Sequence, residues 1–232
     1  MPRGLSSPVA RSFLPFVPPN GPVYRVARRP DPWRPADWAD VGDDLTFGNR
    51  FDDSEGRFRV LYAASNPLAC YLETLARYRK PPTAEQLLST LAAIKNAGDD
   101  HIAFGTVPAS WLRKRALGTA LLTRRRFADV YSSQWLAFLR KQLPFAAPQS
   151  QDFDLALLLS QNRPLTQKVA TLVYRLGYDG IYYQSRHGSD LFNWALFEPF
   201  ELDSPQASDL NAEDPDFKEA LGRLNLILNP DL

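Results

Sequence analysis

The chain has 232 residues, of which 44% are hydrophobic and 23% are charged, and its formal net charge is +1. This composition is typical of an ordinary globular protein large enough for one sizeable core. The small net charge argues against a protein that works mainly on nucleic acid. No apolar run reaches the roughly 18 residues of a membrane-spanning helix, and the single Cys70 excludes an internal disulfide. We therefore expect a cytoplasmic protein that does not enter a membrane.

The first quarter of the chain contains few regular elements. Residues 1–21 are rich in proline and are expected to form a mobile or draped arm. A first strand is expected over 23–27, followed by a long loop over 28–56 that has no hydrophobic period. The sequence RVLYAAS at 59–65 predicts a buried strand.

A well-marked helix follows this strand. Asn66 is a suitable N-cap and Pro67 suits the first helical position. A second helix is expected to run from Thr83 to about Asn96, because Thr83 and Gln86 form a capping-box pattern. The apolar residues of the first helix recur at helical spacing, at Leu68, Tyr71, Leu72, Leu75 and Tyr78.

The remaining elements mix strands and helices without a regular βαβ rhythm, which predicts an α+β fold. Residues 22–202 are expected to form one domain, with the linker and C-terminal helix of 203–232 packed on it. The expected elements are a strand over 102–107, a mostly helical region over 109–143 broken near Gly118, a helix from about 161 to 176, a hairpin of 181–185 and 191–197, a linker over 203–214 and a helix over 215–228.

Several chemistries are excluded by absent motifs. The chain contains neither G-x-G-x-x-G nor a P-loop, and it lacks the G-x-S-x-G of a nucleophile elbow. With only His101, His187 and Cys70 available, a zinc site of Cys and His is not expected, and no metal is expected. Ser185 and His187 would share a strand face, but no third member of a catalytic triad is evident.

Two blocks of sequence carry the functional argument. The first, 48–73, reads GNRFDDSEGRFRVLYAASNPLACYLE and contains Arg50, Tyr62 and Glu73. The second, 178–198, reads YDGIYYQSRHGSDLFNWALFE and contains Ser185. Together they resemble the RES-domain family, which is named for its Arg, Glu and Ser. The matching positions are Asn49-Arg50-Phe51, Val60-Leu61-Tyr62, Glu73, Asp179-Gly180-Ile181, Tyr183, Ser185 and Ala195-Leu196-Phe197.

The resemblance implies a fold like that of ADP-ribosyltransferases, with two small sheets flanking an NAD⁺ cleft and helices around them. It implies a toxin of a toxin–antitoxin pair that is restrained by an Xre-type antitoxin. It also implies that NAD⁺ is a substrate, cleaved at the nicotinamide–ribose bond by hydrolysis, phosphorolysis or transfer of ADP-ribose to a protein acceptor.

The residue types suit this chemistry. A carboxylate such as Glu73 stabilises positive charge that develops on the ribose, and the planar fork of Arg50 suits the pyrophosphate. The expected catalytic residues are Glu73, Arg50 and Ser185, and the residues expected to bind NAD⁺ are Arg25, Arg50, Tyr62, Ser185 and Asn193.

Five of these residues, all but Asn193, also have a plainer interpretation. Glu73 precedes Arg77 by four residues, which favours a surface salt bridge. Arg50 could brace its own loop and Arg25 could pair with an acid. A tyrosine at position 62 is typical of a core, and a serine at position 185 is typical of a turn.

Two other functions remain open from the sequence. A RES-fold module that only binds NAD⁺ or a partner is favoured by the acidic Phe51-Asp52-Asp53, because extra negative charge could disfavour pyrophosphate. A toxin that acts on RNA would use the basic run Arg124-Arg125-Arg126, but a solvated helix face explains that run better, given the small net charge.

Overall fold

The computed structural model describes residues 14–80, 104–124, 126–143, 154–160 and 162–229. The chain divides into two compact units. The first comprises Met1–Val23, Arg34–Ser65 and Leu121–Ser204, and the second comprises Tyr24–Trp33, Asn66–Ala120 and Pro205–Leu232. Among the described residues, no helix is long and apolar enough to cross a membrane.

The first unit is built on five strands in the order β1-β6-β7-β8-β3. The pair β6–β7 is parallel, whereas β1–β6, β7–β8 and β8–β3 are antiparallel. The expected hairpin is thereby confirmed. The strands are β1 (Phe16–Val17), β3 (Val60–Ala64), β6 (Phe127–Asp129), β7 (Gly180–Gln184) and β8 (Phe192–Phe197).

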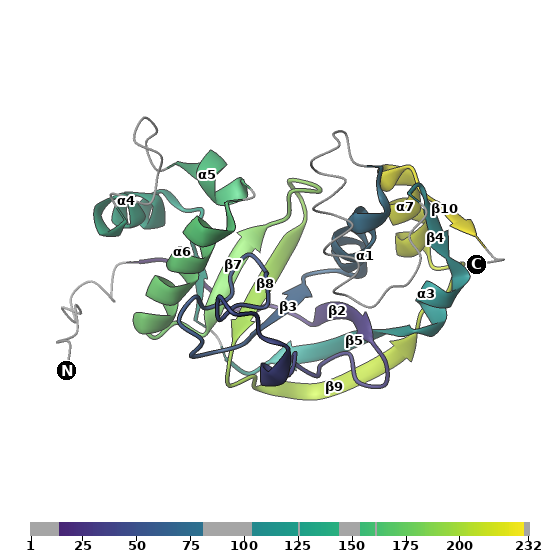
Figure 1. Cartoon of the computed structure of the whole chain (residues 1–232), viewed down its shortest axis with the longest axis horizontal. Coiled ribbons are helices and arrows are strands. Elements are labelled where there is room, and N and C mark those ends of the chain that lie inside the picture. Colours follow the sequence, from purple (N-terminus) through teal and green to yellow (C-terminus); the bar gives the residue numbers. More distant parts are fainter. Residues whose placement is uncertain (1–13, 81–103, 125, 144–153, 161, 230–232) are drawn as a thin grey trace. The chain divides into compact units, whose positions relative to one another are not determined.

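Helix α6 (Arg163–Arg175) covers one face of these strands (Figure 1). Its N-cap is Asn162, whose side chain accepts a hydrogen bond from the Leu165 N–H, and Gly177 follows its end with a φ of 76°. The apolar stripe of α6 packs with Ile181, Ala195 and other sheet residues in one hydrophobic cluster. The unit also contains α4 (Ser133–Gln142), α5 (Leu155–Leu159) and the 3-10 turn η2 (Trp38–Asp40).

The second unit contains most of three neighbouring strands in the order β2-β5-β9, and a parallel pair of β4 and β10. Helix α1 (Pro67–Leu75), continued by the turn η3 (Ala76–Tyr78), packs on α7 (Pro215–Leu224). The remaining elements are β2 (Val23–Arg28), β4 (Thr106–Pro108), α3 (Ala109–Arg113), β5 (Arg115–Leu122), β9 (Leu202–Asp209) and β10 (Ile227–Asn229).

Helix α1 has the cap and the buried stripe that its sequence predicts. The side chain of Asn66 accepts a hydrogen bond from the Ala69 N–H at 2.8 Å. The hydroxyl of Tyr71 donates to Asp214, just before α7, at 2.9 Å. The five residues of the expected stripe, Leu68, Tyr71, Leu72, Leu75 and Tyr78, are all buried.

The expectation of a mostly helical region over 109–143 was wrong for its centre, which forms β5 and β6. In β5 the residues Ala116, Gly118 and Ala120 alternate toward the interior. A side chain at Gly118 would lie 2.7 Å from the indole nitrogen of Trp33, so the strand packs closely there. Small residues carry little hydrophobic signal, and their period of two was therefore hidden.

Two further expectations on element type or length were also wrong. The expected linker at 203–214 is largely strand β9, which is exposed along most of its length. Strand β9 is an edge strand, and an edge strand can contain a proline such as Pro205 because one side of it needs no backbone hydrogen bonds. The last helix ends at Leu224, because Asn225 adopts a left-handed conformation, and β10 follows. Residues 14–17 of the arm are draped on the first unit, which is one of the two states expected for the arm: Leu14 is buried, and the carbonyl of Pro15 accepts from the Trp135 indole at 2.7 Å. The helix expected over 83–96 lies outside the described residues, as does the start of the strand expected at 102.

Candidate active site

A loop in the first unit carries Arg50, and a buried carboxylate closes it. Asp52 accepts hydrogen bonds from the backbone N–H groups of Phe47 at 3.0 Å and Asn49 at 2.7 Å. Burial raises the pKa of Asp52, although these hydrogen bonds oppose the increase. The acid therefore holds the loop together from within.

Two side chains near the start of α6 donate hydrogen bonds to the same loop. The hydroxyl of Thr166 donates to the carbonyl oxygen of Arg50 at 2.5 Å. The side-chain amide of Gln167 donates to the carbonyl oxygen of Asn49 at 3.0 Å. Both α6 residues are buried. Two neighbouring backbone carbonyls are thus fixed to a helix, which limits the positions that the Arg50 side chain can reach.

Tyr62 fixes the loop on its strand side. Its hydroxyl accepts a hydrogen bond from the Phe51 N–H at 2.8 Å and donates to Asp52 at 3.3 Å. Burial raises the pKa of Tyr62 well above its usual value, and the charge of Asp52 adds to the effect. The ring packs against the hydrophobic cluster. Tyr62 therefore belongs to the core, as its plainer interpretation held, and it also supports the site loop.

The guanidinium of Arg50 is held by neutral groups. It donates to the hydroxyl of Tyr131 at 3.2 Å, and its central carbon lies 5.1 Å from the ring of Phe51 and 5.5 Å from that of Tyr183. Its Nε is buried and has no acceptor among the described residues. Within that part of the chain, no carboxylate forms an ion pair with Arg50. Such a half-buried cation without an acidic partner fits an anionic ligand.

The hairpin of β7 and β8 carries the remaining candidates of the first unit, Ser185 and Asn193. Asn193 of β8 lies directly across from Tyr183 of β7, so the two side chains point to the same face. Both Asn193 and Ser185 are buried, at 2% and 3% exposure. The hydroxyl of Ser185 accepts from the His187 N–H at 3.1 Å, a contact that is typical of a turn serine.

Two candidates belong to the second unit. Glu73 is half-buried on α1, between the N-cap and the end of the helix. Arg25 lies on β2, and its Nε donates to the carbonyl oxygen of Pro32 at 2.8 Å, which ties its side chain to the following loop. The structure thus gathers Arg50, Tyr62, Ser185 and Asn193 in the first unit and holds Glu73 and Arg25 on elements of the second.

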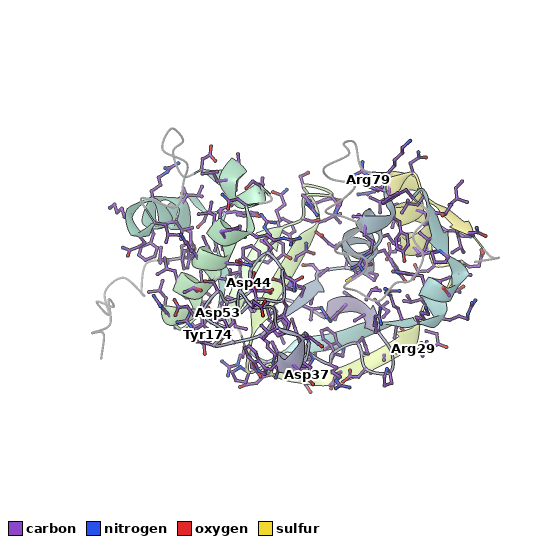
Figure 2. All side chains as sticks on the ribbon, viewed as in Figure 1. Arg29, Asp37, Asp44, Asp53, Arg79 and Tyr174 are labelled. Atoms are coloured by element: carbon purple, nitrogen blue, oxygen red, sulfur yellow. The ribbon has the colours of Figure 1, made fainter. Side chains whose placement is uncertain are left out.

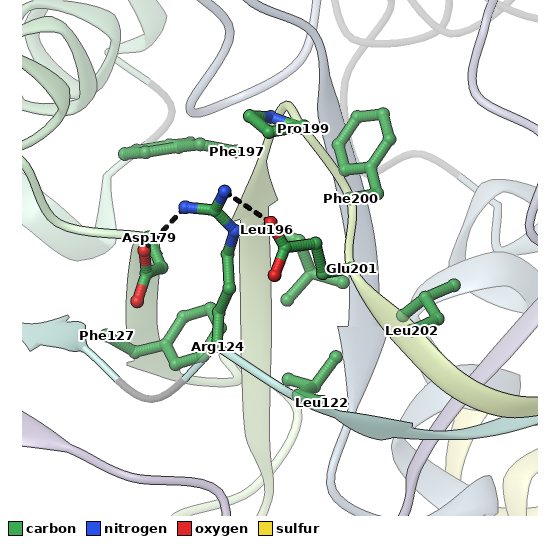
Figure 3. Close-up of a pocket in the computed structure, with 10 residues that line it drawn as sticks. All are labelled: Leu122, Arg124, Phe127, Asp179, Leu196, Phe197, Pro199, Phe200, Glu201 and Leu202. Atoms are coloured by element: carbon green, nitrogen blue, oxygen red, sulfur yellow. Dashed lines mark hydrogen bonds and ion pairs between the residues drawn. The ribbon is translucent and has the colours of Figure 1, made fainter.

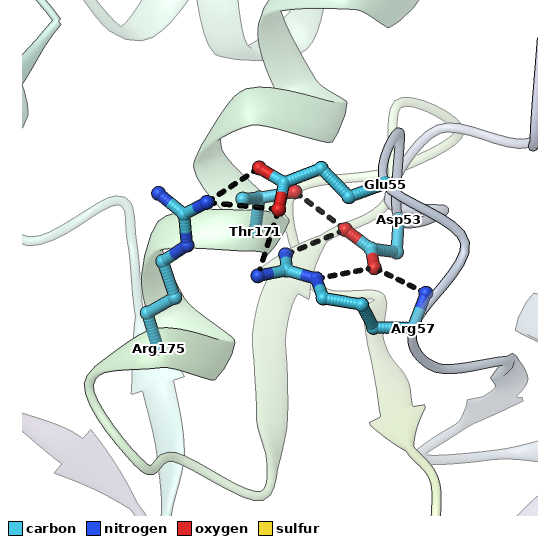
Figure 4. A network of polar contacts seen from close by, with 5 residues as sticks. All are labelled: Asp53, Glu55, Arg57, Thr171 and Arg175. Atoms are coloured by element: carbon cyan, nitrogen blue, oxygen red, sulfur yellow. Dashed lines mark hydrogen bonds and ion pairs between the residues drawn. The ribbon is translucent and has the colours of Figure 1, made fainter. Parts of the chain in front are cut away.

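The second acid of the loop, Asp53, forms an ion pair with Arg57 (Figure 4). Asp53 accepts hydrogen bonds from Arg57 at 2.8 Å and from Thr171 at 2.8 Å. Burial alone would raise the pKa of Asp53, but the hydrogen bonds and charge of Arg57 lower it below its usual value. Glu55 extends the network to Arg175 of α6 at 2.6 Å. Asp53 thus serves the fold, which weakens the sequence argument for an inactive module.

Arg57 also joins this network to the aromatic core. Arg57 pairs with Asp53, and its guanidinium carbon lies 5.8 Å from the ring of Tyr174. Figure 2 labels Asp53 and Tyr174 on the first unit. The ring of Tyr174 stacks on Phe58 at 4.1 Å. The end of the Arg50 loop is therefore anchored on α6 by charge and by packing.

A small pocket in the first unit lies among residues other than these candidates (Figure 3). Arg124 crosses it, bonded to Asp179 at 3.0 Å and to Glu201 at 2.7 Å. Its cavity of about 10 Å³ holds at most one water molecule. Arg124 is therefore neutralised within the protein, which argues against a basic run that binds RNA.

Sequence reasoning missed the residues that position Arg50. Tyr131 lies 81 residues from Arg50, and Thr166 lies 116 residues from it. No local pattern predicts such contacts. Asp53 and Arg57 are four residues apart, but they lie in a loop, where this spacing carries no helical pairing signal.

Comparison with known proteins identifies the family. The family model described as RES domain matches residues 22–217. The chain belongs to the RES domain family. The resemblance inferred from Arg50, Glu73 and Ser185 is thereby confirmed. A chain in the crystal structure of the M. tuberculosis MbcT–MbcA toxin–antitoxin complex is similar to this RES domain, with 16% identity and a TM-score of 0.48 over 84% of this chain and 87% of that one. No curated protein matches the present chain.

Proposed function

We propose that this RES-domain protein consumes NAD⁺ by breaking the nicotinamide–ribose bond, and that it acts as a toxin. The observation that carries the proposal is Arg50, a half-buried cation held by Tyr131, Phe51 and Tyr183 and given no acidic partner in the described part of the chain. Such a group suits the pyrophosphate of a dinucleotide, because a guanidinium can donate two parallel hydrogen bonds to phosphate oxygens.

In the proposed reaction, Glu73 supplies the carboxylate. The bond between nicotinamide and the ribose carbon breaks, and its electron pair leaves with nicotinamide. The ribose carbon then becomes positively charged, and a fixed carboxylate stabilises that charge. An oxygen of water, phosphate or a protein acceptor forms the new bond and loses its proton. Glu73 suits this role because a capped helix holds it.

The other candidates would bind and orient NAD⁺. We assign the hydrogen-bonding groups of Ser185 and Asn193 to a ribose hydroxyl or the carboxamide, because both side chains are buried and polar. Tyr62 acts mainly through the loop that carries Arg50, and Arg25 is a second cation for the pyrophosphate. This proposal includes the ADP-ribosyltransferase-like arrangement, in which two sheets flank the dinucleotide within a catalytic domain of residues 22–202.

An Xre-type antitoxin is the proposed partner, and a protein acceptor of ADP-ribose is a further candidate. Both proposals rest on what the family resemblance implies. Co-expression with the product of a neighbouring helix-turn-helix gene, followed by co-purification, tests the first.

Product analysis tests the function. The full chain is incubated with NAD⁺ in buffer, in phosphate and with bacterial protein, and the products are identified by mass spectrometry. Nicotinamide should appear with ADP-ribose, with ADP-ribose 1″-phosphate or with ADP-ribosylated protein, and the second product identifies the acceptor. Binding of NAD⁺ without nicotinamide release in any of the three conditions would show a binding module.

A further inference from the structure

Tyr131 lies in the turn between β6 and α4. It is half-buried beside the hydrophobic cluster, and its hydroxyl accepts a hydrogen bond from Nη2 of Arg50 at 3.2 Å. Within the described residues, the Arg50 guanidinium makes one hydrogen bond, and Tyr131 is its acceptor. This contact therefore sets the orientation of the guanidinium plane.

The turn that carries Tyr131 is held at both ends. Asp129 pairs with Tyr182 of β7 before it. After it, Ser132 donates its N–H to the carbonyl of Asp129 at 3.0 Å and accepts the Trp135 N–H at the start of α4. Val130, within the turn, is fully buried. A short turn fixed to a strand and a capped helix gives the Tyr131 hydroxyl a defined position.

The other contacts of the guanidinium leave it free to rotate in its own plane. The rings of Phe51 and Tyr183 attract its charge, but the attraction of a cation to a ring face changes little when the guanidinium turns in its own plane. A hydrogen bond is directional and weakens steeply when it is misaligned. The Tyr131 hydroxyl therefore supplies the directional contact that the rings do not.

We propose that Tyr131 is a positioning residue that sets the plane and direction of the Arg50 guanidinium for the anionic part of its substrate. The proposal rests on the proposed function, in which Arg50 binds the pyrophosphate of NAD⁺. Bidentate binding of an oxyanion needs a guanidinium fixed in direction, so removal of the Tyr131 hydroxyl weakens binding through Arg50.

The test is Tyr131→Phe in the full chain, with NAD⁺ affinity measured by calorimetry. The dissociation constant should rise about tenfold, as expected when one hydrogen bond to a charged group is lost. In an Arg50→Ala background the same substitution should have no further effect, because the group that Tyr131 positions is gone. A merely structural role of Tyr131 would lower affinity equally in both backgrounds.

Tyr178→Phe is the matched control, because it removes a buried tyrosine hydroxyl that donates to the carbonyl oxygen of Leu14 in the same unit. Its NAD⁺ affinity should equal that of wild type. If Tyr131→Phe lowers the melting temperature below the assay range, Tyr131→His replaces it, since a ring nitrogen can still accept a hydrogen bond and should retain part of the affinity. Unchanged affinity in Tyr131→Phe, or an equal loss in the Arg50→Ala background, overturns the proposal. Absence of NAD⁺ binding by wild type instead overturns the proposed function, and the role of Tyr131 falls with it.

Discussion

The hydroxyl of Thr166, in the first turn of α6, donates a hydrogen bond to the backbone carbonyl of Arg50 at 2.5 Å. This contact joins the loop of the candidate site to the helix that covers the sheet. Thr166→Val keeps the shape of the side chain but removes the donor, so the Arg50 carbonyl loses a hydrogen-bond partner. We expect the free energy of unfolding to fall by about 1 kcal/mol and NAD⁺ affinity to fall severalfold, as measured by urea unfolding and calorimetry.

Thr74→Val is the control for this substitution. The Thr74 hydroxyl donates to the carbonyl of Cys70 within α1 at 2.7 Å, so the variant removes a similar bond from the second unit. It should leave NAD⁺ affinity unchanged. An equal loss of affinity in both variants would contradict a specific role for the contact between Thr166 and Arg50.

Asp53 predicts a dependence of stability on pH. Its pKa in the folded protein is lowered by Arg57, so the folded state binds fewer protons at this carboxylate than the unfolded chain does. The stabilisation is fully present above the unfolded pKa of about 4 and is lost as the pH falls through the lower folded pKa. Asp53→Asn should therefore cost about 1–3 kcal/mol at neutral pH and progressively less in acid.

Urea unfolding of wild type and Asp53→Asn at several pH values checks this prediction. Glu219→Gln serves as the control, because Glu219 forms an exposed i,i+4 pair with Arg223 on α7. That substitution should change the free energy of unfolding by about 0.5 kcal/mol or less. A cost of Asp53→Asn that is the same at every pH would count against the ion pair as its cause.

Two substitutions of Asp52 separate the contribution of its hydrogen-bond acceptor to stability from that of its charge. Asp52→Asn keeps an oxygen for the N–H groups of Phe47 and Asn49 and removes a charge whose burial raises the pKa of the acid. Its melting temperature should match or exceed that of wild type. Asp52→Ala leaves both N–H groups without an acceptor and should cost about 2 kcal/mol. Equal stability of the alanine variant would show that the carboxylate does not hold the loop.

Glu73→Gln tests the carboxylate of the proposed reaction. The amide has the same shape without the charge, so we expect turnover of NAD⁺ to fall about 100-fold or more while the dissociation constant changes little. Steady-state nicotinamide release and calorimetry measure the two quantities. Glu219→Gln again provides a carboxylate-to-amide control in the second unit. Wild-type turnover in Glu73→Gln would remove Glu73 from the mechanism.

The sequence predicted the parts of the fold whose signals are local. The cap at Asn66, the stripe of α1, the stop at Gly177 and the hairpin of β7 and β8 follow from neighbouring residues. Strand β5 was not predicted because most of its buried residues are small, and β9 was not predicted because it is exposed and has no apolar alternation. These strands are determined by pairing with distant segments, which single-residue preferences do not encode.

In the candidate site, too, some features could be predicted from local sequence and others depend on contacts between distant segments. The types and spacing of Arg50, Glu73 and Ser185 were sufficient to suggest the family. The sequence could not tell whether Arg50 is braced by an acid or by neutral groups, because that depends on Tyr131 and Tyr183, which are distant along the chain. The acids beside Arg50 appeared to oppose an anionic ligand, yet Asp53 is paired with Arg57 inside the protein.

The most direct test of this account is the rate of nicotinamide release from NAD⁺ by wild type and by Arg50→Ala. Wild type should release nicotinamide in at least one of water, phosphate or a protein mixture. Arg50→Ala should lower kcat/KM about 10- to 100-fold, mainly through KM, because a bound phosphate loses its charge-assisted hydrogen bonds. Nicotinamide release that is absent in wild type, or equal in Arg50→Ala, would contradict the central claim.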